Sequence, residues 1–227
     1  MNTTDYFGDW LKAIDKTELI KIINWLNINR NNICPSIENV FKAFRLCPYN
    51  KCKVVMIFQD PYPQKINNIP IATGIPIGNN INTSEDKLSP SLKILKEAAI
   101  NFKIPHNIIN FDNSLEEWCK QGILMLNSAL TCEYNKAGSH TLIWRSFMTK
   151  FINKLSDNRT GLIYLLFGNQ AQSLKPFIKN EYNYIFEYNH PAYYARNHQR
   201  MPNIIFDDLN KLFFKLYNNK LKFFEEL

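Results

Sequence analysis

The chain has 227 residues, of which 45% are hydrophobic, 14% are aromatic and 21% are charged, and its formal net charge is +7. This composition supports a folded core and excludes an acidic solvating protein or a disordered tail. The positive charge permits a polyanionic partner such as nucleic acid without requiring one, because many soluble proteins are basic. The length suits one domain better than two, so we expect a single domain over residues 1–227.

Cysteine usage and hydropathy indicate a soluble protein of a reducing compartment. The chain has five cysteines, none of them paired in a C-x-x-C spacing, which argues against disulfides, a zinc site or an iron–sulfur cluster. Cys47 and Cys52 are close in sequence, but the four histidines are too dispersed to complete a metal site. No apolar run reaches the roughly 18 residues that a membrane span needs, and the start of the chain lacks the pattern of a targeting segment.

The predicted elements begin with a helix over residues 8–30, where apolar residues recur at three- and four-residue steps. A shorter helix is expected over 36–46. Short apolar runs rich in β-branched residues then predict four buried strands, over 53–58, 123–126, 162–167 and 184–188. Further helices are predicted to start at Ser89-Pro90 and at Ser114, and to cover 143–156, 170–179 and 203–217.

Two of these helix starts carry specific signals. Ser89 followed by Pro90 places a serine at the N-cap and a proline at the first helical position. Ser114 and Glu117 have the spacing of a capping box. Strands that alternate with helices predict an α/β fold with a central four-stranded parallel sheet and helices on both faces.

In such a sheet, ligands bind at the carboxyl ends of the strands, so the residues that follow each strand are candidates for a site. Asp60 and Tyr62 follow the first strand, and each precedes a proline that stiffens the loop. A carboxylate on a rigid loop suits catalysis, although an Asp-Pro pair by itself is more typical of a turn. Asn127 follows the second strand, and its amide can read a base edge or another amide.

The third and fourth strands end in two further candidates. Gly168-Asn169 follows the third strand, where backbone N–H groups can hold a phosphate, although this is also an ordinary strand-to-helix junction. His190-Pro191 follows the fourth strand, and a structural or a catalytic histidine fits this position equally well.

Taken together, these motifs resemble those of family 1 uracil-DNA glycosylases, in order and in spacing. The segments that carry the resemblance are Gln59-Asp60-Pro61-Tyr62, Leu126-Asn127-Ser128-Ala129-Leu130-Thr131, Ser139-His140 and His190-Pro191. Leu165–Gln172 is similar to the strand, turn and helix that precede the catalytic histidine of that family, and Ser89–Leu92 to its Pro/Ser clamp loop. The resemblance covers about 50–215, and it implies an N-terminal helical part over 1–50 and a catalytic core over 51–215. Some segments, among them Thr73–Pro76, look like the poxvirus branch, although Ile77 departs even from that branch.

The resemblance implies an enzyme that flips deoxyuridine out of DNA and hydrolyses its N-glycosidic bond in base-excision repair. Asp60 would stabilise the sugar cation and place a water, and His190 would be a neutral hydrogen-bond donor to the uracil anion. The implied substrate-binding residues are Gln59, Tyr62, Ile77 and Asn127. Asn127 would read uracil, and Tyr62 would exclude the methyl group of thymine. The implied DNA-binding residues are Pro90, Ser91, Ser139, Gly168, Asn169, Pro191, Tyr194 and Arg196. No metal and no cofactor are implied.

Four departures from the family pattern bear on activity. Ile77 stands where a phenylalanine stacks on the uracil, and Phe58 stands where glycine is usual. Pro63 replaces a histidine that contacts the DNA backbone, and Tyr194 would take the place of the intercalating leucine. A shifted base preference is therefore one alternative to ordinary uracil excision.

The expected partners are uracil-containing single- or double-stranded DNA, together with a proteinaceous inhibitor or a polymerase, and we expect a monomer with no membrane attachment. The expected location is the cytoplasm for a bacterial source, and the nucleus or a viral replication site for a eukaryotic or viral one. The alternative function is a DNA-binding or replication-accessory protein with weak or altered glycosylase activity. It is suggested by the poxvirus-like segments and by the aromatic, basic stretch 211–217, which equally fits a helix packed on the sheet.

Overall fold

The centre of the fold is a parallel sheet of four strands in the order β6-β2-β8-β9. The computed structural model describes residues 3–80, 82–100 and 108–227. The strands are β2 (Val54–Phe58), β6 (Ile123–Asn127), β8 (Ile163–Phe167) and β9 (Tyr184–Tyr188). Each bound lies within one residue of the bound expected from the sequence, which confirms the α/β fold. All residues of β2, β6 and β8 are buried, and for that reason these strands are continuous apolar runs.

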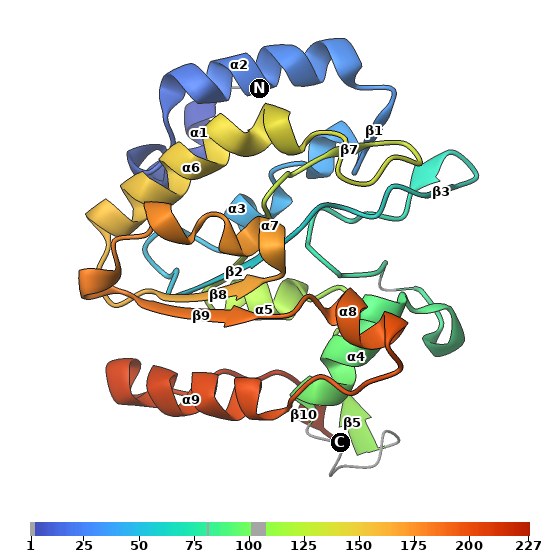
Figure 1. Ribbon diagram of the computed structural model, residues 1–227, viewed down its shortest axis with the longest axis vertical. Helices are drawn as coiled ribbons and strands as arrows, with labels where there is room; N and C mark the ends of the chain where they lie inside the picture. Colours follow the sequence, from blue (N-terminus) through green and yellow to red (C-terminus); the bar gives the residue numbers. More distant parts are fainter. Residues whose placement is uncertain (1–2, 81, 101–107) are drawn as a thin grey trace.

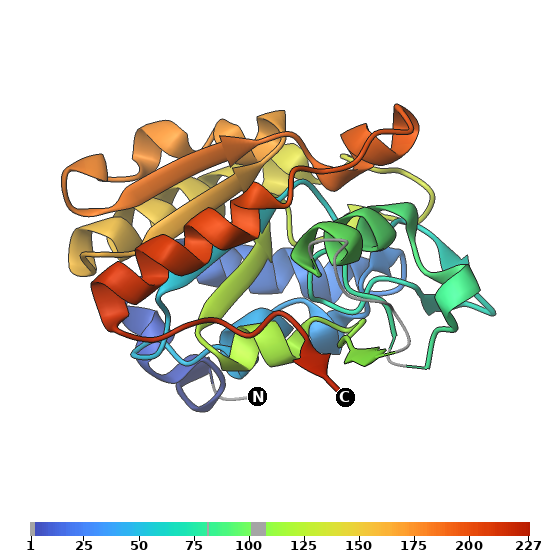
Figure 2. The ribbon, with the colours of Figure 1, turned by 90° about the horizontal axis from the view of Figure 1, so that it is seen from below.

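Helices cover both faces of this sheet, as predicted (Figure 1). On one face α2 (Lys16–Asn29) packs against α6 (Thr141–Asn158). On the other face α9 (Ile204–Tyr217) runs across the sheet, as Figure 2 shows from below. The buried residues of α9 include Phe206, Leu209 and Phe213, so the aromatic, basic stretch 211–217 belongs to a helix packed on the sheet.

Shorter elements complete the fold around the sheet. The remaining α-helices are α1 (Thr3–Phe7), α3 (Lys42–Leu46), α4 (Pro90–Ala99), α5 (Glu116–Lys120), α7 (Asn169–Gln172) and α8 (Pro191–Arg196). Three two-stranded antiparallel ribbons are formed by β1 (Ile33–Cys34) with β7 (Cys132–Glu133), β3 (Lys65–Ile66) with β4 (Ile69–Pro70), and β5 (Ile109–Asn110) with β10 (Glu225–Glu226). Among the described residues, no helix is both long enough and apolar enough to cross a membrane.

Three helices differ from the expected ranges. The helix expected over 8–30 is divided into a 3₁₀ turn at Gly8–Lys12 and α2, because the Asp15 carboxylate accepts a bond from the Glu18 amide at 3.1 Å and starts a new helix. The helix expected over 36–46 is a 3₁₀ turn at Ile37–Asn39 followed by α3. The helix expected over 170–179 ends at Gln172, and a 3₁₀ turn follows at Lys175–Phe177.

The capping box expected at Ser114 is wrong. The N-cap residue of α5 is Leu115, and the Glu117 amide donates to the carboxylate of Asp112 at 2.8 Å. Asp112 also accepts the amide and the hydroxyl of Ser114, at 2.9 and 2.5 Å. The Asp112 carboxylate therefore accepts the hydrogen bond from the Glu117 amide that the capping-box pattern assigns to the Ser114 side chain.

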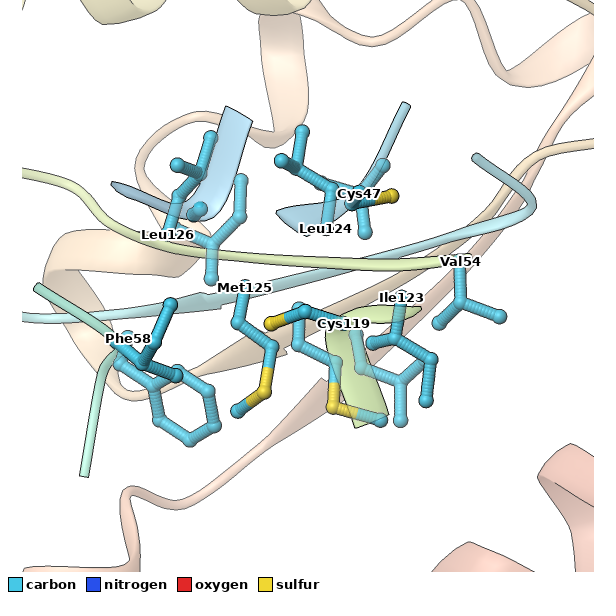
Figure 3. Close-up of a cluster of buried hydrophobic side chains, with 14 of the residues drawn as sticks. Cys47, Val54, Phe58, Cys119, Ile123, Leu124, Met125 and Leu126 are labelled. Carbon is cyan, nitrogen blue, oxygen red and sulfur yellow. The ribbon is translucent and has the colours of Figure 1, made fainter. Parts of the chain in front are cut away.

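The core lies on both faces of the sheet, because successive side chains of a strand point to opposite sides. In β6, Leu124 and Leu126 lie on one side, with Cys47, while Ile123 and Met125 lie on the other, with Cys119 (Figure 3). All five cysteines are buried and free, as expected. Burial raises the pKa of the Cys119 thiol to about 12, so it packs as a neutral apolar group.

Candidate active site

The carboxyl ends of β2, β6 and β9 meet at one pocket. Five of the residues singled out in the sequence line it, namely Asp60, Tyr62, Ile77, Asn127 and His190. Apolar residues complete the lining, among them Val40, Ala72, Ile75 and Leu130. An apolar pocket with a few converging polar groups is the usual form of a small-molecule site.

The Asp60 carboxylate is half-buried in this pocket and held from outside the strand. The backbone N–H of Gly138, in the loop after β7, donates to Asp60 Oδ2 at 2.5 Å. Burial raises the pKa of this carboxyl above its ordinary value, and the Gly138 bond opposes that rise by stabilising the charged form. The N–H therefore both orients the carboxylate and favours its ionised state.

His190 is the N-cap residue of α8, and its ring is locked in one tautomer. Its Nδ1 accepts a hydrogen bond from the Ala192 amide at 3.1 Å, so in the neutral ring the proton is on Nε2. Burial lowers the pKa of His190 to about 4, and the positive charge of Arg196 adds to this effect. Near neutral pH the pocket therefore contains an uncharged imidazole with an Nε2–H donor.

The turn between β8 and α7 supports the His190 ring from behind. Gly168 has φ +85°, and a Cβ at this position would lie 3.1 Å from the Cβ of His190. Both facts require glycine, because its backbone enters this region freely and leaves room for the histidine. Phe58 packs edge-on to the same ring, with 5.9 Å between ring centroids, and stacks on Phe167.

Tyr62 and Asn127 both line the pocket. The Tyr62 hydroxyl donates to the backbone carbonyl of Ile77 at 3.2 Å and lies 2.6 Å from Ser89 Oγ. Burial raises the pKa of Tyr62 to about 12, so this hydroxyl is neutral. Ile77 has φ +66°, which is an outlier for a β-branched residue and directs its carbonyl to Tyr62. Asn127, at the end of β6, is 7% exposed.

Gln59 is the one implied base-contacting residue outside the pocket lining. Its side chain is exposed, and its backbone carbonyl accepts bonds from the Ser128 hydroxyl at 2.7 Å and from the Ala129 amide at 3.1 Å. These bonds join the loop after β2 to the loop after β6, which fixes Asp60 relative to Asn127.

The implied DNA-binding residues lie outside the pocket lining, on segments that adjoin or contact the residues lining it. Ser139 follows Gly138, whose amide holds Asp60, and its own hydroxyl accepts from the Glu133 amide at 2.7 Å. Gly168 and Asn169 begin α7, and Pro191, Tyr194 and Arg196 lie on α8 behind His190. Pro90 and Ser91 begin α4, which packs against α8.

Several residues of the site had no signal, or a misleading one, in the sequence. Val40 and Ala72 line the pocket from loops whose apolar residues look like ordinary core. Gly138 precedes Ser139-His140, and that motif was the available pointer to it. Ser89 was expected to cap α4, but its side chain makes no cap bond and meets Tyr62 instead.

These features define a class of protein: an α/β domain whose strand ends bring a carboxylate, an amide, a tyrosine and a neutral histidine to one small pocket. The family model for the uracil-DNA glycosylase superfamily matches residues 44–222. The uracil-DNA glycosylase of Campylobacter lari is 37% identical over 177 residues, which cover 77% of this chain and 72% of the relative. That of Fusobacterium nucleatum is 33% identical over 200 residues, covering 84% and 83%. The chain belongs to the uracil-DNA glycosylase superfamily.

Solved structures have the same fold. The crystal structure of mimivirus uracil-DNA glycosylase matches with a TM-score of 0.74 at 24% identity, covering 99% of this chain and 93% of that one. A variant of mimivirus UNG in complex with UGI matches with a TM-score of 0.77 at 25% identity, covering 98% and 88%.

Proposed function

We propose that this protein is a uracil-DNA glycosylase that hydrolyses the N-glycosidic bond of a flipped-out deoxyuridine, releases uracil and leaves an abasic site for base-excision repair. The observation that carries this function is the meeting of Asp60, Tyr62, Asn127 and His190 at one pocket, in a chain of this superfamily. Enzymes that act on a base take it out of the stack, and a pocket of this kind suits one flipped base.

Cleavage of the glycosidic bond builds positive charge on the sugar and negative charge on the departing uracil. The ionised Asp60 carboxylate stabilises the sugar cation and orients the attacking water, in the manner of a glycosidase carboxylate. The Nε2–H of His190 donates to uracil O2, where the leaving-group charge develops. One such donor contributes about 3–4 kcal/mol to a transition state in well-studied enzymes.

Selection of uracil falls to two other residues. The Asn127 amide has a donor and an acceptor, and it pairs with uracil O4 and N3–H, a pattern that cytosine does not offer. The Tyr62 ring occupies the space next to C5 of the base, where thymine has a methyl group. Gln59, next to Asp60, is a further substrate-binding residue. Ile77 contacts the base where the family has a stacking aromatic ring.

We further propose that the protein is a family 1 member with poxvirus-like segments, that it works as a monomer, and that Pro90, Ser91, Ser139, Gly168, Asn169, Pro191, Tyr194 and Arg196 contact the DNA strand around the flipped base. The order of the motifs supports membership of family 1.

A mimivirus UNG variant has been solved in complex with UGI, so UGI is the inhibitor to test here. We expect the protein in the compartment that contains the DNA it repairs. In a bacterial source this compartment is the cytoplasm.

Replacement of Asp60 by Asn tests the function. The Asp60→Asn variant keeps the shape of the side chain and removes its charge, so uracil release from a single-stranded oligonucleotide with one uracil should fall at least about 100-fold. Abasic sites are measured by alkaline cleavage of the labelled strand. Asp208→Asn is the matched control, because Asp208 lies on α9 in a surface ion pair with Lys211 and should keep full activity. Absence of uracil release by the unaltered protein, even in molar excess over DNA, contradicts the proposal.

A further inference from the structure

The hydroxyl of Ser89 has an unusual environment for a serine that begins a helix. Serine at an N-cap normally accepts a bond from an amide of the first turn, but the side chain of Ser89 makes no such bond. Its Oγ lies 2.6 Å from the Tyr62 hydroxyl instead, across 27 residues of sequence. The Ser89 backbone is itself fixed, because its N–H donates to Asn79 Oδ1 at 2.8 Å. The position of the Ser89 hydroxyl is therefore fixed by its backbone.

The direction of the hydrogen bonds follows from the chemistry of the partners. The Tyr62 hydroxyl has one proton, and the Ile77 carbonyl, 3.2 Å away, can only accept. For both bonds to exist together, Tyr62 must donate to Ile77 and Ser89 must donate to Tyr62. The Tyr62 oxygen is then held from two sides.

The rest of Tyr62 is held by other groups. Its ring packs against Cys34, Ala72 and Cys132. The Cys132 thiol donates to the carbonyl of Pro61 at 3.3 Å, and the Cys34 thiol to that of Pro63 at 3.6 Å. The backbone and the base of the ring are thus fixed by the β1–β7 ribbon, whereas the hydroxyl end is held by Ile77, by Ser89 and by the Ser91 side chain.

We propose that Ser89 is a specificity-determining residue that acts by positioning Tyr62, so that the ring cannot swing away when a base with a substituent at C5 enters the pocket. The proposal rests on the glycosylase function proposed above. Steric exclusion selects only if the excluding group cannot move, and a ring anchored at both ends moves less than a ring anchored at one. Ser89 is the residue directly before α4, so the segment that contains the proposed phosphate-clamp residues Pro90 and Ser91 also holds the base-selecting ring.

The test compares bases that differ only at C5. Single-stranded oligonucleotides with uracil, 5-fluorouracil, 5-bromouracil or thymine at one position are treated with the unaltered protein and with Ser89→Ala. The ratio of kcat/KM for uracil to that for each substituted base should fall about three- to tenfold in Ser89→Ala, the factor that one ordinary hydrogen bond supplies. Uracil excision itself should change less than about threefold, because no group that touches uracil is removed. Ser89→Thr keeps the hydroxyl and should restore the ratio.

Two further variants make the result specific. Ser84 is another serine at a helix N-cap without a side-chain cap bond, so Ser84→Ala is the matched control and should leave the ratio unchanged. Tyr62→Phe removes the same hydrogen bond from the other partner, together with the bond to the Ile77 carbonyl. It should lower the ratio at least as much as Ser89→Ala does, and the double variant should show no loss beyond that of Tyr62→Phe.

The outcomes separate this inference from the proposed function. If the unaltered protein excises uracil and both Ser89→Ala and Tyr62→Phe keep the full ratio, the positioning role is wrong and the function stands. If Ser89→Ala fails to fold, Ser89→Cys takes its place in the comparison, because a thiol keeps the size of the side chain and is a weaker hydrogen-bond donor. If the unaltered protein releases no uracil, the proposed function fails and the inference fails with it.

Discussion

At the scale of single residues, the protonation state of His190 is the property on which the chemistry depends most. An ordinary histidine has a pKa near 6.5, but burial and the charge of Arg196 lower that of His190 to about 4. The Ala192 amide already occupies Nδ1, so the ring can donate from Nε2 without carrying a charge. A neutral donor keeps its proton more firmly than an imidazolium, which suits stabilisation of the leaving group by a hydrogen bond rather than by full proton transfer.

This shift predicts a specific pH dependence. The unfolded chain binds a proton at this histidine below about pH 6.5, whereas the folded protein binds it only below about pH 4. The unfolded state therefore holds more protons between these values, and His190 should cost about 3 kcal/mol of folding stability as the pH falls from 6.5 to 4. Urea denaturation at a series of pH values should show this loss, and His190→Gln should remove it.

An NMR titration of the ring should show the same shift in pKa. Its C–H signals should show no transition near pH 6.5, and Arg196→Gln should move the transition upward because the neighbouring positive charge is gone. A His190 transition near 6.5 in the unaltered protein would contradict the neutral-donor role.

At the scale of elements, the turn between β8 and α7 lies against His190, the proposed catalytic histidine. Gly168→Ala places a methyl group 3.1 Å from the Cβ of His190 and also imposes φ +85° on alanine. We expect uracil excision to fall more than about tenfold, since a shift of about 1 Å in a catalytic group has effects of this size or larger. Measurement of kcat/KM and of the melting temperature separates displacement of the ring from general destabilisation.

Gly161→Ala is the control for the backbone cost. Gly161 has φ +77° and precedes the same strand at its other end, where a Cβ would meet only the Tyr217 hydroxyl, at 3.3 Å. Both variants should lose about 1–2 kcal/mol of stability through the strained φ. Equal kcat/KM losses in the two variants would show that the close approach to His190 has no catalytic consequence.

Helix boundaries are also decided at this scale, and they explain the errors of the sequence analysis. The apolar periodicity of 8–30 continues through Asp15, but the Asp15 carboxylate caps α2 and also bonds Lys154 of α6 at 3.1 Å. Asp112 displaces Ser114 as the capping group of α5 in a similar way. Periodicity identifies which residues face the core, whereas a competing carboxylate decides where a helix begins.

At the scale of the whole molecule, the net charge of +7 matches a polyanionic substrate. Each protein charge that contacts a phosphate of single-stranded DNA contributes about 0.7 to the slope of log affinity against log salt. Arg196 is exposed on α8, which begins at the catalytic histidine. We expect Arg196→Gln to lower this slope by about 0.7, measured as the Kd of the inactive Asp60→Asn variant for a uracil-containing strand at several salt concentrations.

Lys120→Gln is the control for net charge. Lys120 lies on α5, which leads into the amino end of β6, at the sheet edge opposite the pocket, and it pairs with Glu117 at 2.6 Å. The Lys120→Gln variant loses the same charge as Arg196→Gln, but it loses that charge away from the proposed DNA-binding residues. An equal change of slope in both variants would mean that Arg196 contributes only to the general field.

The strands and the residues at their ends could be predicted from the sequence. Strands buried on both faces are continuous apolar runs, and the carboxyl ends of parallel strands meet at one edge, so Asp60, Asn127 and His190 were expected to lie together. All three line the same pocket. The motif order was enough to indicate the family before any geometry was known.

Only the tertiary structure decided how these groups are held and charged. Gly138 is 78 residues from Asp60 and Ser89 is 27 residues from Tyr62, yet these pairs form hydrogen bonds that orient the Asp60 carboxylate and the Tyr62 ring, the groups proposed for catalysis and base selection. The lowered pKa of His190 arises from burial and from the charge of Arg196, at the far end of α8. Hydrogen bonds and desolvation depend on distances in space, and those distances exist only after the chain has packed.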